Sequence, residues 1–270
     1  MEMPLKRAVK TTAVYCWRDG AGTEVQDQIA EEVPVALSYN GISHAVMMAS
    51  PLALRDFALG FSLSERIIHS PDELYGVDIE EHEEGLELAL EISSERMMNL
   101  RHQRRTLSGR TGCGLCGTES LEQAIRPLQP LAASALPAHE AVQHALQQLS
   151  LNQPLQNMTG ALHGAAWCDA DGQVLLARED VGRHNALDKL IGALAARRTA
   201  REGGGFALVS SRASYEMVHK CVSTGINTLV AVSAPTSLAI KMARDANLNL
   251  IGFARRGHHS VYSPKYGEEI

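Results

Sequence analysis

Cys113 and Cys116 are the residues whose type and spacing most clearly permit chemistry, and they lie in the stretch SGRTGCGLCGTESL. A CxxC pair wrapped in glycines can hold a metal, form a disulfide or carry sulfur, because a thiolate is both a nucleophile and a metal ligand. Five cysteines are too few and too scattered for a disulfide framework, and their odd number is typical of reduced thiols: Cys16, Cys113, Cys116, Cys168 and Cys221. We therefore expect a chemical rather than an architectural role for the pair.

Three kinds of site are compatible with these two cysteines. A structural zinc site needs four ligands, and the sequence has no second CxxC or HxxxH, although His163 and Cys168 could supply the missing pair. A thioredoxin-like exchange centre would open a helix within an early strand-helix unit, whereas this CxxC follows a basic, glycine-rich segment. A sulfur carrier needs a nucleophilic thiolate on a backbone that can move between donor and acceptor. The sulfur carrier is the interpretation that we favour.

The surroundings of the pair suit a reactive thiolate. Backbone freedom comes from four glycines, Gly109, Gly112, Gly114 and Gly117. The preceding run RHQRRTLSGR holds four arginines and no acidic residue, and Thr118 or Ser120 can cap a helix that begins directly after the cysteines. Positive charge and a helix N-terminus both lower a thiol pKa. They act on both cysteines alike, so charge does not distinguish Cys113 from Cys116.

Composition narrows the function classes. A net charge of −6 over 270 residues argues against general nucleic-acid binding. No run of about 18 apolar residues is present, and the N-terminus has no apolar stretch long enough for a signal peptide or a membrane span. We therefore expect no membrane association and a cytoplasmic location.

The N-terminal part is predicted to be a small sheet with a helix. Asn40-Gly41 separates two apolar runs and predicts a hairpin over residues 33–48. Ser50-Pro51 is typical of an N-cap followed by a first-turn proline, and predicts a helix over residues 52–68. A second hairpin is expected over residues 76–92, with its turn near Glu84-Gly85. Residues 140–149 have the pattern of a further helix.

From about Gly160 onward, strand and helix patterns alternate. The expected strands are 173–179, 206–211, 228–233 and 250–255, and the expected helices are 161–168, 181–198, 214–225 and 237–246. Such alternation predicts a layered α/β domain with a mostly parallel sheet. Two helices would begin at the carboxyl ends of strands, after SSRAS and SAPTS, where backbone amides and the helix dipole favour anions.

Five motifs occur in order along the chain: TGCGLCGTESL, REDVGRHNALDKLIG, SSRASYEMVHKC, SAPTSLAI and LIGFARR. With these motifs the sequence resembles the FdhD family of formate dehydrogenase accessory sulfurtransferases. The resemblance implies a protein that takes sulfur as a persulfide from a cysteine desulfurase and passes it to the molybdenum cofactor that formate dehydrogenase needs. It also implies that Cys113 carries the persulfide, that Cys116 assists, and that the fold is cytidine-deaminase-like.

The family resemblance further implies that the bound acceptor is Mo-bis(molybdopterin guanine dinucleotide), with the stretch FARRGH as its site: Phe253, Ala254, Arg255, Arg256, Gly257 and His258. Arginines after a strand can fork onto phosphate oxygens. Further donors are expected if the strands lie side by side, from Arg183, Arg212, Ser210, Ser211 and Ser214. A carboxylate can accept from a guanine edge, which makes Asp180 and Glu179 candidates for base recognition.

The domain organisation expected is an N-terminal β-hairpin and helix region over 1–107, a CxxC loop with its helix and connection over 108–137, and an α/β cofactor-binding domain over 138–270. No permanently bound metal is expected, and a homodimer is compatible with the sequence. A non-catalytic cofactor chaperone with zinc at the CxxC is the alternative function. A deaminase is a third hypothesis, because TGALHGAA is similar to a deaminase metal helix, but Ala165 occupies the place of the glutamate that acts as general acid and base.

Overall fold

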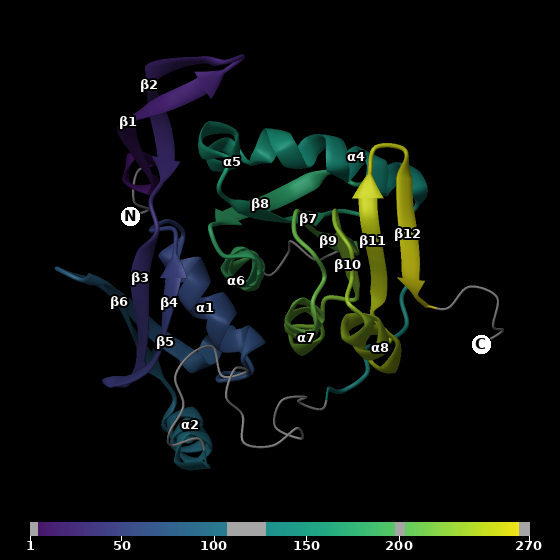
Figure 1. Cartoon of the computed structure of the whole chain (residues 1–270). Coiled ribbons are helices and arrows are strands. Elements are labelled where there is room, and N and C mark those ends of the chain that lie inside the picture. The colour runs from purple at the N-terminus through teal and green to yellow at the C-terminus, as the bar shows by residue number, and fades with distance from the viewer. Residues whose placement is uncertain (1–4, 107–127, 198–202, 265–270) are drawn as a thin grey trace.

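The carboxyl-terminal half of the chain is built on a six-stranded sheet with the order β12-β11-β10-β9-β7-β8 (Figure 1). The structure is a computed structural model and describes residues 5–106, 128–197 and 203–264. The strands of this sheet are β7 His163–Cys168, β8 Val174–Asp180, β9 Phe206–Val209, β10 Thr228–Ala231, β11 Asn249–Arg255 and β12 His258–Ser263.

This sheet is mixed, so the expectation of a mostly parallel sheet is wrong. Strand β10 is parallel to β9 and β11, but β7 is antiparallel to both of its neighbours, β8 and β9, and β12 is antiparallel to β11. The physical reason lies in the connections, because strands joined by a tight turn must run in opposite directions. Short turns join β7 to β8 and β11 to β12, whereas helices join β9 to β10 and β10 to β11.

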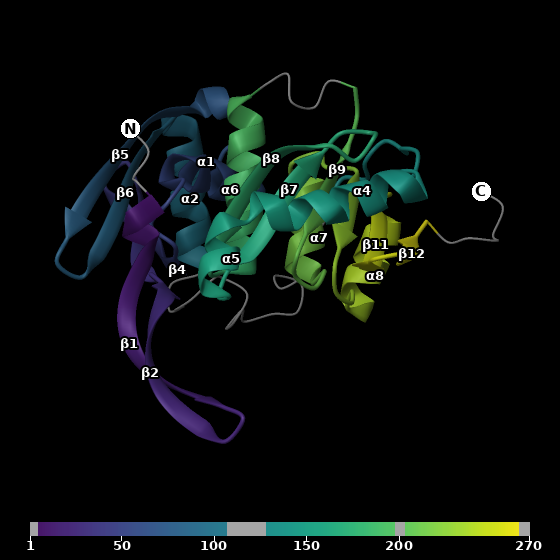
Figure 2. The same ribbon diagram turned by 90° about the horizontal axis from the view of Figure 1, so that it is seen from above.

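Helices cover both faces of the central sheet (Figures 1 and 2). One face packs on α6 Arg183–Ala196, α7 Tyr215–Ser223 and α8 Ser237–Asp245, and the other face packs on α4 His139–Leu149. Successive residues of β9 face opposite sides of the sheet. Ala207 and Val209 pack in the core beneath α6, α7 and α8, whereas Phe206 and Leu208 pack in the core beneath α4. The short helices η3 Ser150–Asn152 and α5 Pro154–Thr159 follow α4.

A second sheet with the order β4-β3-β6-β5 forms the N-terminal part. Its strands are β3 Val33–Tyr39, β4 Ile42–Ala49, β5 Leu74–His82 and β6 Gly85–Ile92, and its helices are α1 Leu54–Ser64, η2 Pro71–Glu73 and α2 Ser94–Thr106. Both predicted hairpins are confirmed. Asn40 and Gly41 have φ values of 48° and 77°, as a two-residue hairpin turn of this kind requires.

Helix α1 lies between this second sheet and α6, and two glycines allow the close crossing. A Cβ added at Gly60 would lie 1.7 Å from the backbone oxygen of Asp188, and one added at Gly192 would lie 1.9 Å from that of Asp56. Only glycine at both positions lets the two helix backbones touch, so this contact fixes the N-terminal part against the carboxyl-terminal layers.

An isolated two-stranded ribbon, β1 Val9–Arg18 with β2 Ala21–Ala30, follows the short helix η1 Leu5–Ala8 and extends away from both sheets (Figures 1 and 2). Sequence analysis did not predict it. Near its tip, Tyr15 and Trp17 are 64% and 70% exposed and pack edge to face, with ring centroids 5.8 Å apart. The ribbon therefore holds two large aromatic side chains in water.

Two local expectations are wrong. Ser50 does not cap α1, which begins at Leu54 after Ala53 in a left-handed conformation. The backbone N–H of Ser50 instead donates to Asp180, and its hydroxyl accepts from Val181, so its polar groups are used between the two parts of the chain. Residues 163–168 form β7 rather than a helix, and none of the helices in the described ranges is long and apolar enough to cross a membrane.

Candidate functional site

The loops that follow the parallel strands β9, β10 and β11 lie together at the carboxyl edge of the sheet, and they contain the motifs selected from the sequence. Backbone hydrogen bonds join these loops in series, from Ser233 N–H to Ser211 O at 3.4 Å and from Phe253 N–H to Ser233 O at 3.1 Å. Strand β7 runs in the opposite direction, so it begins at this edge, and Ser210 receives the N–H of Gly164 on its hydroxyl at 2.9 Å. One continuous edge thus extends from β7 to β11.

The predicted cofactor residues are distributed along this edge. Arg183 is the first residue of α6, Ser210 and Arg212 lie in the loop between β9 and α7, and residues 253–258 form the end of β11 and the following turn. Strands β9 and β11 are separated by β10, which places their ends roughly 10 Å apart. Ala254 is buried in the core under α4, so its side chain faces away from solvent. The remaining members are at least partly exposed.

Two buried donors at this edge have no hydrogen-bond partner among the described residues, namely Nε of Arg183 and the hydroxyl of Ser214. They stand at the beginnings of α6 and α7, whose N-cap residues Gly182 and Ser214 make no side-chain cap. The first N–H groups of a helix need partners, and so does a buried polar atom. Two helix N-termini and two unused donors together make a setting for an anion such as phosphate.

Two further residues, which the sequence analysis did not select, connect α6 with α7. Nε2 of His184 lies 2.7 Å from a carboxylate oxygen of Glu216. The hydrogen bond from His184 lowers the pKa of Glu216 against the effect of burial, with help from the charges of His184 and Arg183. The available sequence signal was a histidine and a glutamate in the first turns of two successive helices.

His163, at the start of β7, faces the same positive charges. Burial lowers its pKa, and the nearby Arg183 and His184 lower it further, while Asp180 acts in the opposite direction. His163 therefore favours the neutral imidazole. A neutral imidazole beside a guanidinium can accept a hydrogen bond without adding positive charge to the edge.

The turn after β11 presents two arginines to solvent. Arg255 and Arg256 are both exposed, and Arg255 lies over the ring of Phe253 at 5.7 Å. Phe253 and Gly257 have φ values of 50° and 72°, and the pairing of β11 with β12 shifts between Gly252 and Arg255. The bulge bends the end of β11, and the arginines follow that bend.

The two carboxylates considered for guanine recognition are engaged elsewhere. Both oxygens of Glu179 accept backbone N–H groups at the start of α5, from Leu155 at 3.0 Å and from Gln156 at 2.8 Å. Burial raises the pKa of Glu179, and these two bonds counteract it. Asp180 is fully buried and binds Lys189, so neither carboxylate is free to read a base.

Comparison with known proteins identifies the family of the chain. The model of the FdhD/NarQ family matches residues 30–267. The chain belongs to the FdhD/NarQ family. A relative named sulfur carrier protein FdhD from Cupriavidus necator is 55% identical over 94% of this chain and 88% of its own length. Another protein of that name from Xanthomonas euvesicatoria is 50% identical over 97% of this chain and 95% of its own.

The fold also matches a solved structure. A crystal structure described as that of a formate dehydrogenase accessory protein from Desulfotalea psychrophila has a TM-score of 0.72 and 22% identity, covering 95% of this chain and 98% of the other. The six-stranded mixed sheet and the second, smaller sheet are therefore an arrangement that an experimentally determined protein shares.

The CxxC of this FdhD/NarQ chain lies outside the described residues, so the roles of Cys113 and Cys116 stay predictions. The other three cysteines are placed. Cys16 is half-buried on the ribbon, whereas Cys168 and Cys221 are buried, and burial raises the pKa of Cys168 to about 12. A thiol with such a pKa stays protonated at neutral pH.

The zinc ligands suggested in addition to the CxxC do not come together in this family member. His163 and Cys168 are the first and last residues of β7, so five residue steps separate them by roughly 16 Å. They also face opposite sides of the sheet, because an odd number of steps lies between them. No single metal can bind both, so these two residues do not complete the zinc site that was considered as an alternative.

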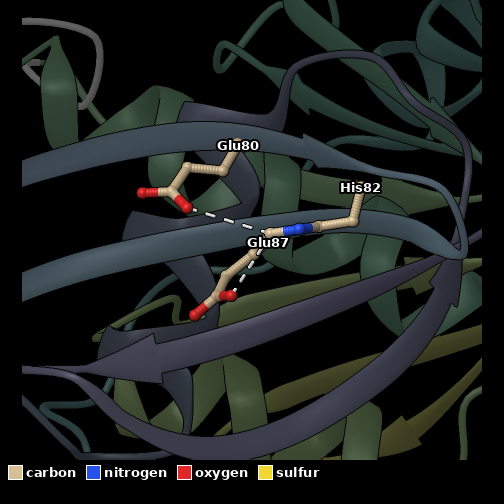
Figure 3. A group of neighbouring side chains, drawn as sticks. All are labelled: Glu80, His82 and Glu87. Carbon is tan, nitrogen blue, oxygen red and sulfur yellow. Dashed lines mark ion pairs between the residues drawn. The ribbon is translucent and has the colours of Figure 1, made fainter.

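One group of side chains in the described part has metal-ligand types close together, Glu80, His82 and Glu87 on the hairpin of β5 and β6 (Figure 3). Glu80 and Glu87 are opposite each other in the strand register, and Nε2 of His82 lies 3.8 Å and 3.5 Å from their oxygens. An exposed imidazole between two carboxylates is a sufficient account of this group. It lies on the second sheet, apart from the carboxyl edge.

Proposed function

We propose that this FdhD/NarQ protein is a sulfurtransferase that carries sulfur, as a persulfide on Cys113, from a cysteine desulfurase to Mo-bis(molybdopterin guanine dinucleotide) for formate dehydrogenase. The observation that carries the proposal is the family match over residues 30–267, which includes both cysteines, together with relatives of 50–55% identity that bear the name sulfur carrier protein. The orphaned donors at the carboxyl edge support a second site that holds an anionic cargo.

The loading step is a thiol-disulfide type exchange. The thiolate of Cys113 attacks the outer sulfur of the persulfide on the desulfurase. A new sulfur-sulfur bond forms on Cys113, the bond on the desulfurase breaks, and its cysteine leaves as a thiolate. No electrons are gained or lost overall, because one persulfide replaces another.

The release step uses the second cysteine. The thiolate of Cys116 attacks the inner sulfur of the Cys113 persulfide and forms a Cys113–Cys116 disulfide. The outer sulfur leaves as hydrosulfide, having received the two electrons that the thiols lose, and becomes the ligand of the cofactor molybdenum. A thiol reductant then restores the two cysteines for another cycle.

The carboxyl edge would hold the charged part of the cargo. Phosphate oxygens of a dinucleotide can accept from Nε of Arg183 and from the Ser214 hydroxyl, which lack other partners in the described part of the chain. Arg255 and Arg256 add two exposed guanidinium groups for bidentate contact. Binding there would leave the sulfur-accepting end of the cargo accessible to a separate, sulfur-bearing segment.

The test of the carrier function is intact-mass analysis after incubation with L-cysteine and a cysteine desulfurase. We expect the purified protein to gain one sulfur atom that a thiol reductant removes, because a persulfide sulfur is labile to reduction. Zinc content is measured on the same sample. A protein that gains no sulfur and retains one zinc ion would contradict the proposal and favour the metal-binding chaperone.

Guanine-nucleotide binding should depend on the two exposed arginines and on salt. Arg255→Ala or Arg256→Ala is expected to weaken binding of guanosine diphosphate about tenfold, since each removes a charge-assisted contact to phosphate. Affinity should also fall as ionic strength rises. Isothermal titration calorimetry at several salt concentrations measures both effects.

The matched control for these variants is Arg197→Ala. Arg197 is an exposed arginine at the opposite end of α6 from Arg183. It should leave the affinity unchanged. Equal affinities for all three variants, or an affinity independent of salt, would move the nucleotide site away from the turn after β11.

A further inference from the structure

The turn that carries the two arginines is held from outside by one side chain of α4. The side-chain amide of Gln143 donates from Nε2 to the carbonyl oxygen of Arg255 at 3.2 Å, and its Oε1 accepts the backbone N–H of Gly257 at 2.6 Å. A single planar amide thus contacts the residues on both sides of Arg256. No other side chain among the described residues makes a comparable pair of hydrogen bonds to this turn.

The local backbone explains why this turn needs such support. Arg255 pairs with His258, so Arg256 and Gly257 form a two-residue hairpin loop. Favoured loops of this length have a positive φ at the first residue, whereas here only the second, Gly257, has one. Such a loop does not match the twist of the strands that it joins, and a bulge at Phe253 disturbs the pairing just before it.

The helix that bears Gln143 is itself fixed. Ala141, Val142 and Ala145 of α4 are buried against the central sheet. At the first turn of α4, the ring of His139 packs on that of His259 in β12, with centroids 5.0 Å apart. Gln143 therefore projects from a helix that is packed against the sheet. The same helix contacts β12 through His139 and the turn through Gln143 itself.

We propose that Gln143 is a positioning residue, which holds the Arg255–Gly257 turn so that both arginines face the phosphates of a guanine nucleotide. This inference rests on the proposed function of that turn. Arg255 and Arg256 carry like charges on adjacent residues, and neither pairs with a carboxylate within the described ranges. Fixing the backbone beforehand removes part of the ordering cost that a mobile turn would add to binding.

The decisive variant is Gln143→Met, which keeps the length and volume of the side chain and removes both hydrogen bonds. We expect affinity for guanosine diphosphate, measured by calorimetry, to fall about five- to tenfold, as the loss of two exposed neutral hydrogen bonds would give. The control is Gln147→Met, one turn further along the same helix with an exposed side chain. It should bind as the unchanged protein does.

A double-mutant cycle separates positioning from a merely structural effect. In a background of Arg255→Ala with Arg256→Ala, the Gln143→Met change should have no further effect on affinity, because the groups that it positions are gone. An additive loss in that background, or no loss from Gln143→Met alone, would overturn the inference. If the arginine variants themselves bind normally, the proposed nucleotide site fails and the positioning role fails with it.

Thermal unfolding of each variant completes the test. The melting temperature of Gln143→Met should stay within a few degrees of the parent, since one partly exposed side chain on the outer face of a surface helix contributes little to global stability. A large drop that accompanies the lost affinity in both backgrounds would assign Gln143 a role in folding rather than in binding.

Discussion

Replacing Cys113 with alanine is expected to abolish the sulfur gain completely, while Cys116→Ala should still gain one sulfur atom and fail to release it. The reason is the division of roles proposed for the pair, in which Cys113 holds the persulfide and Cys116 attacks its inner sulfur. Intact-mass analysis after desulfurase treatment measures the gain. Formate dehydrogenase activity, restored in the presence of each variant, measures the release.

The structure supplies the control for this experiment. Cys16 is the accessible cysteine of the described part, whereas Cys168 and Cys221 are buried. A Cys16→Ala variant should therefore gain sulfur as the unchanged protein does. Persistence of the full gain in Cys113→Ala, with loss in Cys16→Ala, would reassign the carrier to the ribbon. Full restoration of formate dehydrogenase by Cys116→Ala would remove the proposed release step.

Lys189→Met is expected to lower the free energy of unfolding by about 3–5 kcal/mol. Lys189 is fully buried, and its Nζ lies 2.5 Å from Asp180 and 2.9 Å from the backbone oxygen of Ser50. Burial lowers the pKa of Lys189, and the attraction of Asp180 offsets this only in part. Removing the lysine leaves a buried carboxylate that has no other ion-pair partner in the part of the chain that the structure describes.

Asp180 increases the expected loss of stability, because its carboxylate also accepts hydrogen bonds from two separate segments of the chain. Its other contacts are the N–H groups of Ser50 at 3.0 Å and Gly182 at 2.8 Å, and the amide of Asn185 at 3.1 Å. An unpaired charge at this point disturbs the segment after β4 and the start of α6 together. Urea unfolding followed by circular dichroism measures the loss.

Lys241→Met is the matched control for Lys189→Met. Its ion pair with Asp245 has the same chemistry, but the two side chains are 73% and 63% exposed. An exposed pair of this kind contributes at most about 1 kcal/mol. A loss from Lys189→Met as small as that from Lys241→Met would show that the buried pair does not anchor the chain.

Much of the fold was accessible from local patterns. The hairpin at Asn40-Gly41 was predicted because a two-residue loop needs two positive φ values, which these residues adopt at low cost. The helices over α6, α7 and α8 followed from apolar periodicity. The ribbon of β1 and β2 was missed, because its alternation buries no face and therefore leaves no hydrophobic pattern to find.

Strand direction and long-range contacts were beyond those patterns. Residues 163–168 are mostly apolar and too few to show a period, and a short apolar run does not distinguish helix from strand. Because residues 163–168 were predicted to be a helix, the antiparallel hairpin of β7 and β8 was not predicted, and neither was the mixed sheet that contains it. Ser50 looked like a cap because its real partners, Asp180 and Val181, lie about 130 positions further along the chain.

The arrangement of the predicted residues was accessible only in part. The loops after β9 and β11 lie at one edge, because the carboxyl ends of parallel strands meet there, and their role in binding stays a prediction. The pair of His184 and Glu216 depends on how α6 crosses α7, which no spacing within the sequence encodes. Asp180 was considered for base recognition because the local sequence does not show that it is buried. Its burial depends on the segment around Ser50, which is far away in the sequence.

The exposed ribbon and the buried strand β7 each carry one tryptophan, which gives the protein two separate optical probes. The chain has two tryptophans: Trp17 on the ribbon is 70% exposed, and Trp167 in β7 is 4% exposed. Emission from Trp17 is open to an aqueous quencher such as iodide, whereas that from Trp167 is shielded until the core opens. A partner that covers the ribbon would protect the first fluorophore and leave the second unchanged, so quenching can follow docking and unfolding independently in the unlabelled protein.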